Sequence, residues 1–217
     1  MNLIISPAIR QKLSSKQPPV NEDDILQCFS NRTGKLLEDT REDNQTTPPT
    51  KWFIAQTDYG VNLKIVFIHR PGIGIFIRTA YAQTAKKFAY IRNMDKRSIM
   101  SKPVEKHTAN ASLIASTDDA WDSRELGCSE AHVKVSDDQL DMEINDALEL
   151  HPISIRLNKS LIEDLKMIAD LHGLGYQPLI RQVLTRFADC EKKRILQEVH
   201  SKEVSKPQKE PRQKKVA

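Results

Sequence analysis

The stretch "HPISIRLNKSLIEDLKMIADLHGLGYQPLIRQVLTRFADCEKK", residues 151–193, decides the fold of the C-terminal third of the chain. At its start, apolar residues alternate with the polar Ser154 and Arg156. Strict alternation predicts a short strand with one apolar and one polar face. The apolar members are Ile153, Ile155 and Leu157.

Two amphipathic helical patterns follow, each with its own boundary signals. Asn158 is expected to cap the first helix, and Gly173 supplies the left-handed position that ends it. Pro178 fits the first turn of the second helix, where a missing N–H is tolerated. The apolar stripes are Leu161, Ile162, Leu165, Ile168 and Ala169 in the first helix and Leu179, Ile180, Val183, Leu184 and Phe187 in the second.

One short strand and two short helices cannot bury these apolar faces alone. We therefore expect a homodimer in which two copies pair their strands antiparallel across a two-fold axis. The pairing leaves Ser154 and Arg156 exposed on a two-stranded ribbon that fits a DNA major groove. Arginine can bond guanine bidentately there, and the amides near Gln177 can hold a phosphate.

The order of strand, capped helix, glycine turn and second helix, with "ISIRL" and "IRQVL", resembles the ribbon-helix-helix fold of CopG- and BrnA-type repressors and antitoxins. The resemblance covers residues 152–193 and implies binding to operator DNA. The candidate DNA-binding residues are Ser154, Arg156, Asn158 and Gln177. An unrelated helical hairpin is the alternative.

Charge is distributed unevenly along the chain, although the net charge is only +4. Residues 1–99 carry 15 Lys and Arg against 9 Asp and Glu, whereas residues 118–149 carry 2 against 11. The acidic residues can cover a basic face, or they can simply solubilise their segment. Within them, "SDDQLDMEINDALEL" predicts an amphipathic helix behind a Ser-Asp cap, with the stripe Leu140, Ile144, Ala147 and Leu148.

The first part of the chain is rich in strand-forming residues. "KWFIAQT", "NLKIVFIHR" and "GIGIFIRTAYA", within residues 51–82, are separated by turn signals and predict an antiparallel meander. A short helix is expected to begin at Asn21, and residues 83–93 can form a closing helix. Alternation places Lys64 on a largely covered sheet face. We expect an α+β fold with one or two helices packed on a small antiparallel sheet.

The sequence divides into five parts. We expect the α+β domain in residues 1–93, a linker in 94–117, the acidic segment in 118–150, the strand-helix-helix module in 151–194 and a disordered basic tail in 195–217. Met94 and Met100 at the first join fit either two adjacent reading frames joined end to end or chance.

Composition limits where in the cell we expect the protein and which chemistry we expect of it. No stretch is apolar for long enough to cross a membrane, and "MNLIISPAIRQKL" lacks a charged leader, so we expect a soluble, cytoplasmic protein. Cys28, Cys128 and Cys190 lack the spacing of metal sites or disulfide frameworks and are expected to be reduced structural thiols. We expect no metal and no cofactor.

Residues 22–90 resemble the small BrnT-like toxins of the RelE-related ribonuclease class, whose partners are ribbon-helix-helix antitoxins. The resemblance rests on the helix-then-meander order, the "DTRE" loop and the "IRTAY" ending. It implies cleavage of RNA without a metal, by attack of a ribose 2′-OH on the adjacent phosphate. This chemistry needs cations that neutralise the phosphate and a group that moves protons.

Several residues of the first domain can supply these groups on one concave face. The candidate catalytic residues are Arg41, Lys64, Arg78 and Tyr81. Each can equally be a surface cation or a core tyrosine. Lys51 and Arg32 are second choices, and His69 is expected to be exposed to solvent because it ends a strand beside a turn.

Together these features favour a fused toxin-antitoxin polypeptide. In this hypothesis the acidic segment masks a ribonuclease, within one chain or between chains, and the dimeric module binds operator DNA and represses its own operon. One alternative is a non-catalytic transcriptional regulator whose N-terminal domain serves for docking or sensing. Another is an RNA-binding protein that uses its basic tail.

Overall fold

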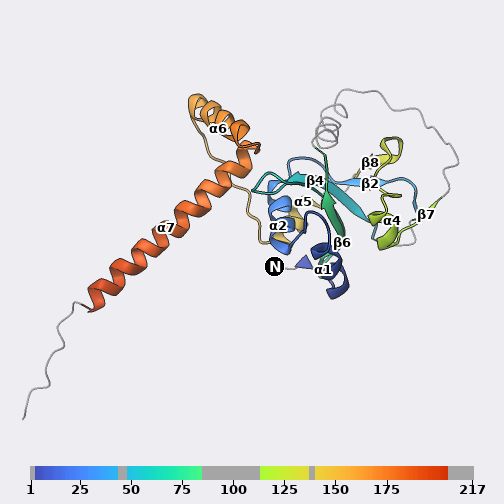
Figure 1. The fold of residues 1–217 in the computed structure, drawn as a ribbon, viewed down its shortest axis with the longest axis horizontal. Helices are drawn as coiled ribbons and strands as arrows, with labels where there is room; N and C mark the ends of the chain where they lie inside the picture. Colours follow the sequence, from blue (N-terminus) through green and yellow to red (C-terminus); the bar gives the residue numbers. More distant parts are fainter. Residues whose placement is uncertain (1–2, 44–47, 85–112, 137–139, 205–217) are drawn as a thin grey trace, which may run out of the picture.

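The computed structural model describes residues 3–43, 48–84, 113–136 and 140–204 of the 217-residue chain. The fold is α+β, as the sequence predicts, and centres on a six-stranded, mostly antiparallel sheet (Figure 1). The strands in spatial order are β1 (Leu3–Ile4), β6 (Gly74–Ala82), β5 (Asn62–Arg70), β4 (Lys51–Gln56), β2 (Leu37–Asp39) and β8 (Val133–Val135). A separate parallel pair consists of β3 (Glu42–Asp43) and β7 (Ile114–Ala115).

The predicted meander is confirmed by β4, β5 and β6, which pair antiparallel in that order. Its register shifts in the middle of β5. Val66 lies opposite Thr79, whereas the next residue, Phe67, lies opposite Ile77. Arg78 is therefore the extra residue of a β-bulge, a feature that turns a side chain away from the regular alternation.

Two N-terminal helices, α1 (Pro7–Ser14) and α2 (Glu22–Asn31), pack on the sheet. The predicted helix after Asn21 is confirmed as α2, with a capping box in which Asn21 and Asp24 bond each other's backbone N–H. No element is predicted for the segment that forms α1. Its N-cap is Ser6, followed by a proline at the start of the helix.

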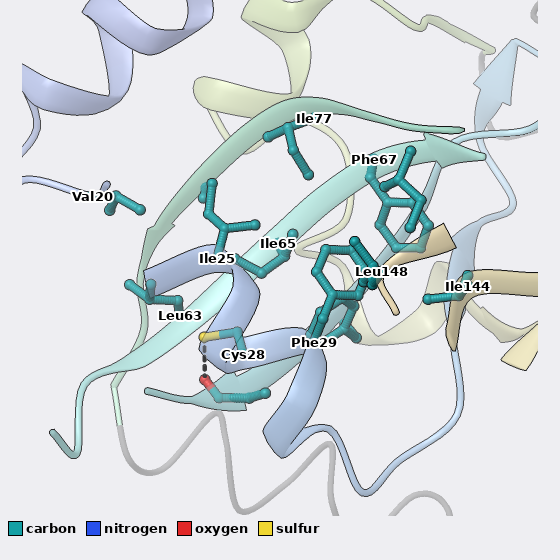
Figure 2. Packing of buried hydrophobic residues seen from close by; sticks show 14 of the residues in the cluster. Val20, Ile25, Cys28, Phe29, Leu63, Ile65, Phe67, Ile77, Ile144 and Leu148 are labelled. Atoms are coloured by element: carbon teal, nitrogen blue, oxygen red, sulfur yellow. Dashed lines mark hydrogen bonds between the residues drawn. The ribbon is translucent and has the colours of Figure 1, made fainter. Parts of the chain in front are cut away.

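The larger core lies between α2 and one face of the sheet (Figure 2). Phe29 of α2 meets Phe53 and Phe67 edge to face, with ring centroids 4.8 and 5.2 Å away. Cys28 is buried beside them and its thiol donates to the Ala55 carbonyl oxygen at 3.6 Å. This cysteine is a structural thiol as predicted, whereas Cys190 is exposed and is not.

The predicted acidic helix forms α5 (Asp141–Ala147) and belongs to the first domain's core. Ile144 and Leu148 are buried in the same cluster as the phenylalanines, and Figure 2 shows Leu148 among their rings and Ile144 at the edge. The helix begins after Leu140 without a side-chain cap, and Asp137 of the predicted Ser-Asp cap lies outside the described residues. Burial of the apolar stripe, rather than capping, holds this short helix.

Residues 113–135 complete the sheet and cover its second face. They comprise β7, α4 (Asp118–Asp122), the 3-10 turn η1 (Glu130–His132) and β8. β8 pairs with β2, and Trp121 of α4 packs into a second core with Trp52 and Val66. The predicted linker therefore ends too late, because residues 114 and 115 already pair with β3.

The C-terminal third consists of α6 (Lys159–Leu171) and α7 (Tyr176–Val204), joined by a turn in which Gly173 has φ +66°. Both predicted helices and the left-handed position are thus confirmed. Residues 151–158 have no regular secondary structure in the single chain. The strand predicted there requires a second copy and stays a prediction.

α7 continues further than the sequence predicts, away from the sheet (Figure 1). Residues 195–204, which the predicted disordered tail included, are helical. Arg194 bonds Glu191 and Glu198 one turn away on either side, and such pairs support an exposed helix.

The predicted closing helix in residues 83–93 falls almost wholly outside the described residues, and residues 83 and 84 are not helical. The rest of the predicted linker up to residue 112 and the tail from residue 205 also lie outside them. None of the helices in the described part of the chain combines the length and apolar character needed to span a lipid bilayer.

Candidate functional site

The candidate site is the sheet face that α4 and its neighbours cover. Along β5, Leu63, Ile65 and Phe67 point into the larger core, and Lys64 and Val66 point the opposite way. We call residues 113–128, which lie over Lys64 and Val66, the covering segment. All four candidate catalytic residues contact this segment.

Lys64 is enclosed where the covering segment is closest to the sheet. Its side chain is 1% exposed, and its ammonium donates to the Gly127 carbonyl oxygen at 2.6 Å. The ammonium also lies 4.0 Å from the centre of the Trp52 ring and 5.4 Å from that of Trp121. The aromatic faces and the carbonyl offset part of the cost of burying this charge.

Arg78 projects from the bulge into a cluster of oxygens. Its Nε lies 2.7 Å from Asp118 Oδ1, and its Nη1 and Nη2 lie 2.6 and 2.7 Å from Ser116 Oγ and the Ser116 carbonyl oxygen. Within the first domain, Nη1 also donates to Thr50 Oγ1 at 3.1 Å. The covering segment thus presents a carboxylate and a carbonyl to a guanidinium fork, the arrangement that guanidinium uses to bind phosphate.

Arg41 is divided between its own domain and the covering segment. Its guanidinium donates hydrogen bonds to both carboxylate oxygens of Asp39, at 3.1 and 2.9 Å. It also donates to the Glu125 carbonyl oxygen at 2.7 Å. Burial alone would raise the pKa of Asp39, but hydrogen bonds from Arg41 and from the Gly127 N–H outweigh it and lower that pKa. Part of the charge on Arg41 is therefore neutralised by Asp39.

Tyr81 lies opposite Lys64 on β6 and is 6% exposed. Its hydroxyl is 3.8 Å from the Cys128 Sγ, and the guanidinium of Arg124 lies 5.2 Å from the centre of its ring. Burial, together with Cys128, raises the pKa of Tyr81. The covered phenol therefore holds its proton more tightly than an exposed tyrosine does.

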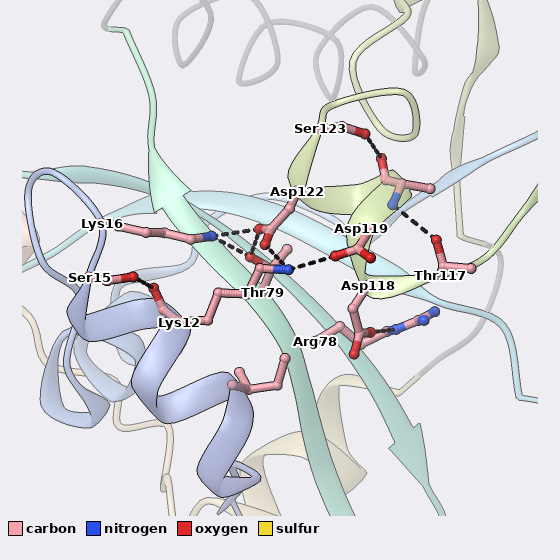
Figure 3. A network of polar contacts seen from close by, with 12 residues as sticks. Lys12, Ser15, Lys16, Arg78, Thr79, Thr117, Asp118, Asp119, Asp122 and Ser123 are labelled. Carbon is pink, nitrogen blue, oxygen red and sulfur yellow. Dashed lines mark hydrogen bonds and ion pairs between the residues drawn. The ribbon is translucent and has the colours of Figure 1, made fainter.

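Two further lysines of the site are not among the candidate residues predicted from the sequence. Lys12 and Lys16, at α1 and just after it, both pair with Asp122 of α4 (Figure 3). Lys16 also donates to Thr79 Oγ1 on β6, at 2.6 Å. The signal that could have found them is the "SPAIRQKL" pattern, in which Ser-Pro starts a helix and Ile9 and Leu13 face the sheet.

The second-choice cations, Lys51 and Arg32, bond other partners, and the expected exposure of His69 to solvent is wrong. Lys51 is buried and bonds Glu38 and Ser136, while Arg32 bonds Asp141 at 2.6 Å. His69 is 4% exposed rather than solvent-exposed. The reason is α5, which contacts the neighbouring strand β6 and brings Glu143 within 3.6 Å of the His69 ring.

The candidate DNA-binding residues are accessible. Ser154, Arg156, Asn158 and Gln177 are all exposed. Asn158 is the N-cap residue of α6, but its side chain makes no cap hydrogen bond. The Gly175 N–H, just before α7, donates to Gln56 Oε1 at 2.7 Å, so this amide is not directed at solvent.

The α6–α7 pair is attached to the first domain by polar contacts. Arg181 of α7 donates to the Asn31 side chain and to the Ser30 carbonyl oxygen, at 2.5 and 2.7 Å, at the end of α2. Gln182 donates to the Asp58 carbonyl oxygen at 3.0 Å. A cation at a helix C-terminus satisfies carbonyls that the helix leaves unpaired.

The fold is α+β, and the four candidate residues all contact the covering segment of the same chain. Over 80 residues of its N-terminal part, the chain is 44% identical to the uncharacterized protein PM1122 of Pasteurella multocida (strain Pm70). Those residues are 37% of this chain and 74% of that protein. The chain belongs to the same family as PM1122. No family model and no solved structure matches it.

Proposed function

We propose that this chain joins a metal-independent ribonuclease toxin to an antitoxin that neutralises it and represses its own operon. The observation that carries the proposal is the covering segment. Each residue that the toxin resemblance suggested for catalysis contacts it: Arg41 through Glu125, Lys64 through Gly127, Arg78 through Ser116 and Asp118, and Tyr81 through Cys128.

The uncovered face has the groups that RNA cleavage needs. In the proposed reaction the ribose 2′-OH gives its proton to solvent water, and its oxygen attacks the adjacent phosphate, forming a 2′,3′-cyclic phosphate and expelling the 5′-oxygen of the next nucleotide. Arg78 and Lys64 would stabilise the extra negative charge on the phosphate, and Tyr81, once uncovered, would protonate the leaving oxygen. No step requires a metal.

The covering segment would inhibit RNA cleavage by occupying the cationic groups that bind phosphate. The Asp118 carboxylate and the Gly127 carbonyl take the positions on Arg78 and Lys64 that phosphate oxygens would need. Because the inhibitor shares a chain with its target, its effective concentration is about millimolar. RNA would therefore compete poorly until the covering segment is released.

The α6–α7 pair supports the repressor half of the proposal. Ile153 and Ile155 are 73% and 58% exposed in the single chain, next to the equally exposed Ser154 and Arg156. A second copy would cover the isoleucines and leave the polar residues on the outer face of a ribbon. That ribbon would be the operator-binding surface.

Expression of residues 1–93, alone and together with residues 94–217 as a second polypeptide, tests the proposal. Circular dichroism must first establish that the short piece folds without α5 and β8. The folded short piece should slow growth and degrade RNA, and the second polypeptide should restore growth. Arg78→Ala in the short piece should abolish toxicity, whereas Arg70→Ala, at an exposed arginine of the same sheet, should not. A short piece that folds but leaves growth and RNA unchanged contradicts the ribonuclease.

A second candidate function is a regulator without catalysis, and the burial of Lys64 favours it. A lysine held between two tryptophans can serve purely to attach the covering segment. The regulator is the better description if Arg78→Ala with Tyr81→Ala leaves every cellular phenotype unchanged while Arg156→Ala abolishes DNA binding.

A further inference from the structure

The side chain of Asp122 is held by groups from two separate parts of the first domain (Figure 3). Lys16 Nζ lies 2.6 Å from Asp122 Oδ1, and Thr79 donates to the same oxygen. Lys12 forms an ion pair with Oδ2. Asp122 is 15% exposed at its side chain, so these contacts are shielded from water on most sides.

This cradle has more cationic and donor capacity than one carboxylate needs. Lys12 and Lys16 bring two positive charges to Asp122, which carries one negative charge. Asp119 also reaches Lys12, at 3.1 Å, but its side chain is 94% exposed and contributes little. Two ammonium groups and a hydroxyl match a phosphate, which offers more acceptor oxygens than a carboxylate.

The residues before Asp122 continue the pattern along α4. Asp118 lies on Arg78, and Trp121, between the two carboxylates in the sequence, is fully buried in the same core as Trp52. The order is an anion, an aromatic ring and an anion on one face. Single-stranded nucleic acid binds proteins with the same alternation, phosphates on cations and bases on aromatic side chains.

We propose that α4 is a built-in analogue of single-stranded RNA, and that Lys12, Lys16 and Thr79 form a backbone-phosphate subsite which Asp122 occupies. A second phosphate would take the place of Asp118 on Arg78, and a base would take the place of Trp121 beside the Lys64 ammonium. The inference deepens the proposed ribonuclease function and rests on it for the identity of the ligand.

The position of the cradle agrees with this assignment. Lys16 also donates to the Ala80 carbonyl oxygen at 3.0 Å, and its ammonium lies 5.4 Å from the centre of the Tyr81 ring. A phosphate in the cradle would therefore lie next to the groups proposed for proton transfer. Lys12 and Lys16 would hold the RNA strand and are positioning residues rather than catalytic ones.

Rescue of the full chain by phosphate tests the subsite directly. Asp122→Ala leaves the cradle vacant, and its melting temperature should fall by several degrees. Inorganic phosphate at tens of millimolar should then recover about 2–4 °C relative to chloride at the same ionic strength. The wild-type chain and Asp119→Ala, which leaves the cradle filled, should gain no more than the chloride control.

A double variant separates specific from general effects of phosphate. Asp122→Ala with Lys16→Ala should lose the rescue, and Asp122→Ala with Arg10→Ala should keep it. Arg10 lies on α1, as Lys12 does, but pairs with Glu22. If the Lys16 variant is misfolded by circular dichroism, Lys12→Ala replaces it. Rescue that survives the loss of either lysine, or that is equal in wild type, overturns the subsite.

A short single-stranded DNA oligonucleotide, which lacks the 2′-OH and cannot be cleaved, distinguishes strand phosphate from free phosphate. Fluorescence anisotropy should show at least about tenfold tighter binding to Asp122→Ala than to wild type. Binding of phosphate but not of the oligonucleotide overturns the RNA analogue. Binding of both without cleavage of an RNA of the same sequence supports the subsite and contradicts the ribonuclease.

Discussion

At the scale of single residues, Gly127 controls how closely the covering segment approaches the sheet. Its φ is +69°, a conformation that only glycine adopts without cost. A Cβ at this position would overlap Lys64 Nζ and would lie 2.6 Å from Trp121 Cζ3. Both neighbours are buried, so neither can move aside easily.

We therefore expect Gly127→Ala to loosen the covering segment by about 3 kcal/mol, of which about 1 kcal/mol is backbone strain. Hydrogen exchange in residues 113–128 should accelerate accordingly. Gly72→Ala is the matched control, since Gly72 has φ +72° and a Cβ there would meet no atom within 4 Å, so this variant should show the strain alone. Equal exchange in the two variants would contradict a tight contact at Gly127.

A pH dependence follows from Asp122. Burial alone would raise its pKa, but hydrogen bonds from Lys12, Lys16 and Thr79 outweigh burial and lower the pKa below the usual 3.8. Because the folded pKa is depressed, the stabilisation is complete above about pH 4 and is lost as pH falls through the folded value. Tryptophan fluorescence should report release of Trp121 on acidification. Asp122→Asn should flatten this change, and an unchanged acid transition would contradict the assignment.

At the scale of secondary-structure elements, the longer patterns in the sequence identify most of the fold. The meander strands and α2, α6 and α7 all have clear alternation, stripes or caps. β1, β2, β3, β7 and β8 were not predicted, because strands of two or three residues show no periodicity. Their positions depend on partners far away, such as Leu37 opposite Val135.

α5 shows how an element can be predicted while its role is missed. Its stripe was clear, but only the structure reveals that it packs on the phenylalanines of the first domain. We expect Ile144→Ala to lower the free energy of unfolding by about 2–4 kcal/mol, through lost burial and a cavity. Met142→Ala, on the exposed side of α5, should cost less than about 0.5 kcal/mol in the same denaturant titration. Similar losses would contradict this packing.

At the scale of the whole molecule, the sequence predicts only some of the residues that form the candidate site. The sequence identifies four residues of types suited to the chemistry, Arg41, Lys64, Arg78 and Tyr81, and all four contact the covering segment. Lys12 and Lys16 were missed because their partner Asp122 is more than a hundred residues away along the chain. The bulge at Arg78 likewise depends on pairing with β5.

The expected homodimer is also a property of the whole molecule. Ile155 is 58% exposed in the single chain and would be buried in a paired ribbon. Ile155→Asp should therefore weaken dimerisation by about 3 kcal/mol, or roughly a hundredfold. Leu196→Asp, at an exposed position further along α7, should leave sedimentation unchanged. A monomeric wild-type chain, or equal effects of both variants, would contradict the ribbon.

The most direct test of the central claim is the rate at which the purified full chain cleaves single-stranded RNA, with and without the acidic contacts of the covering segment. Asp118→Asn with Asp122→Asn removes two charge-assisted contacts, so cleavage should rise by about a hundredfold over wild type. Adding Arg78→Ala should abolish the gain. Equal rates in wild type and the doubly substituted chain, after hydrogen exchange has verified release of residues 113–128, would contradict a masked ribonuclease.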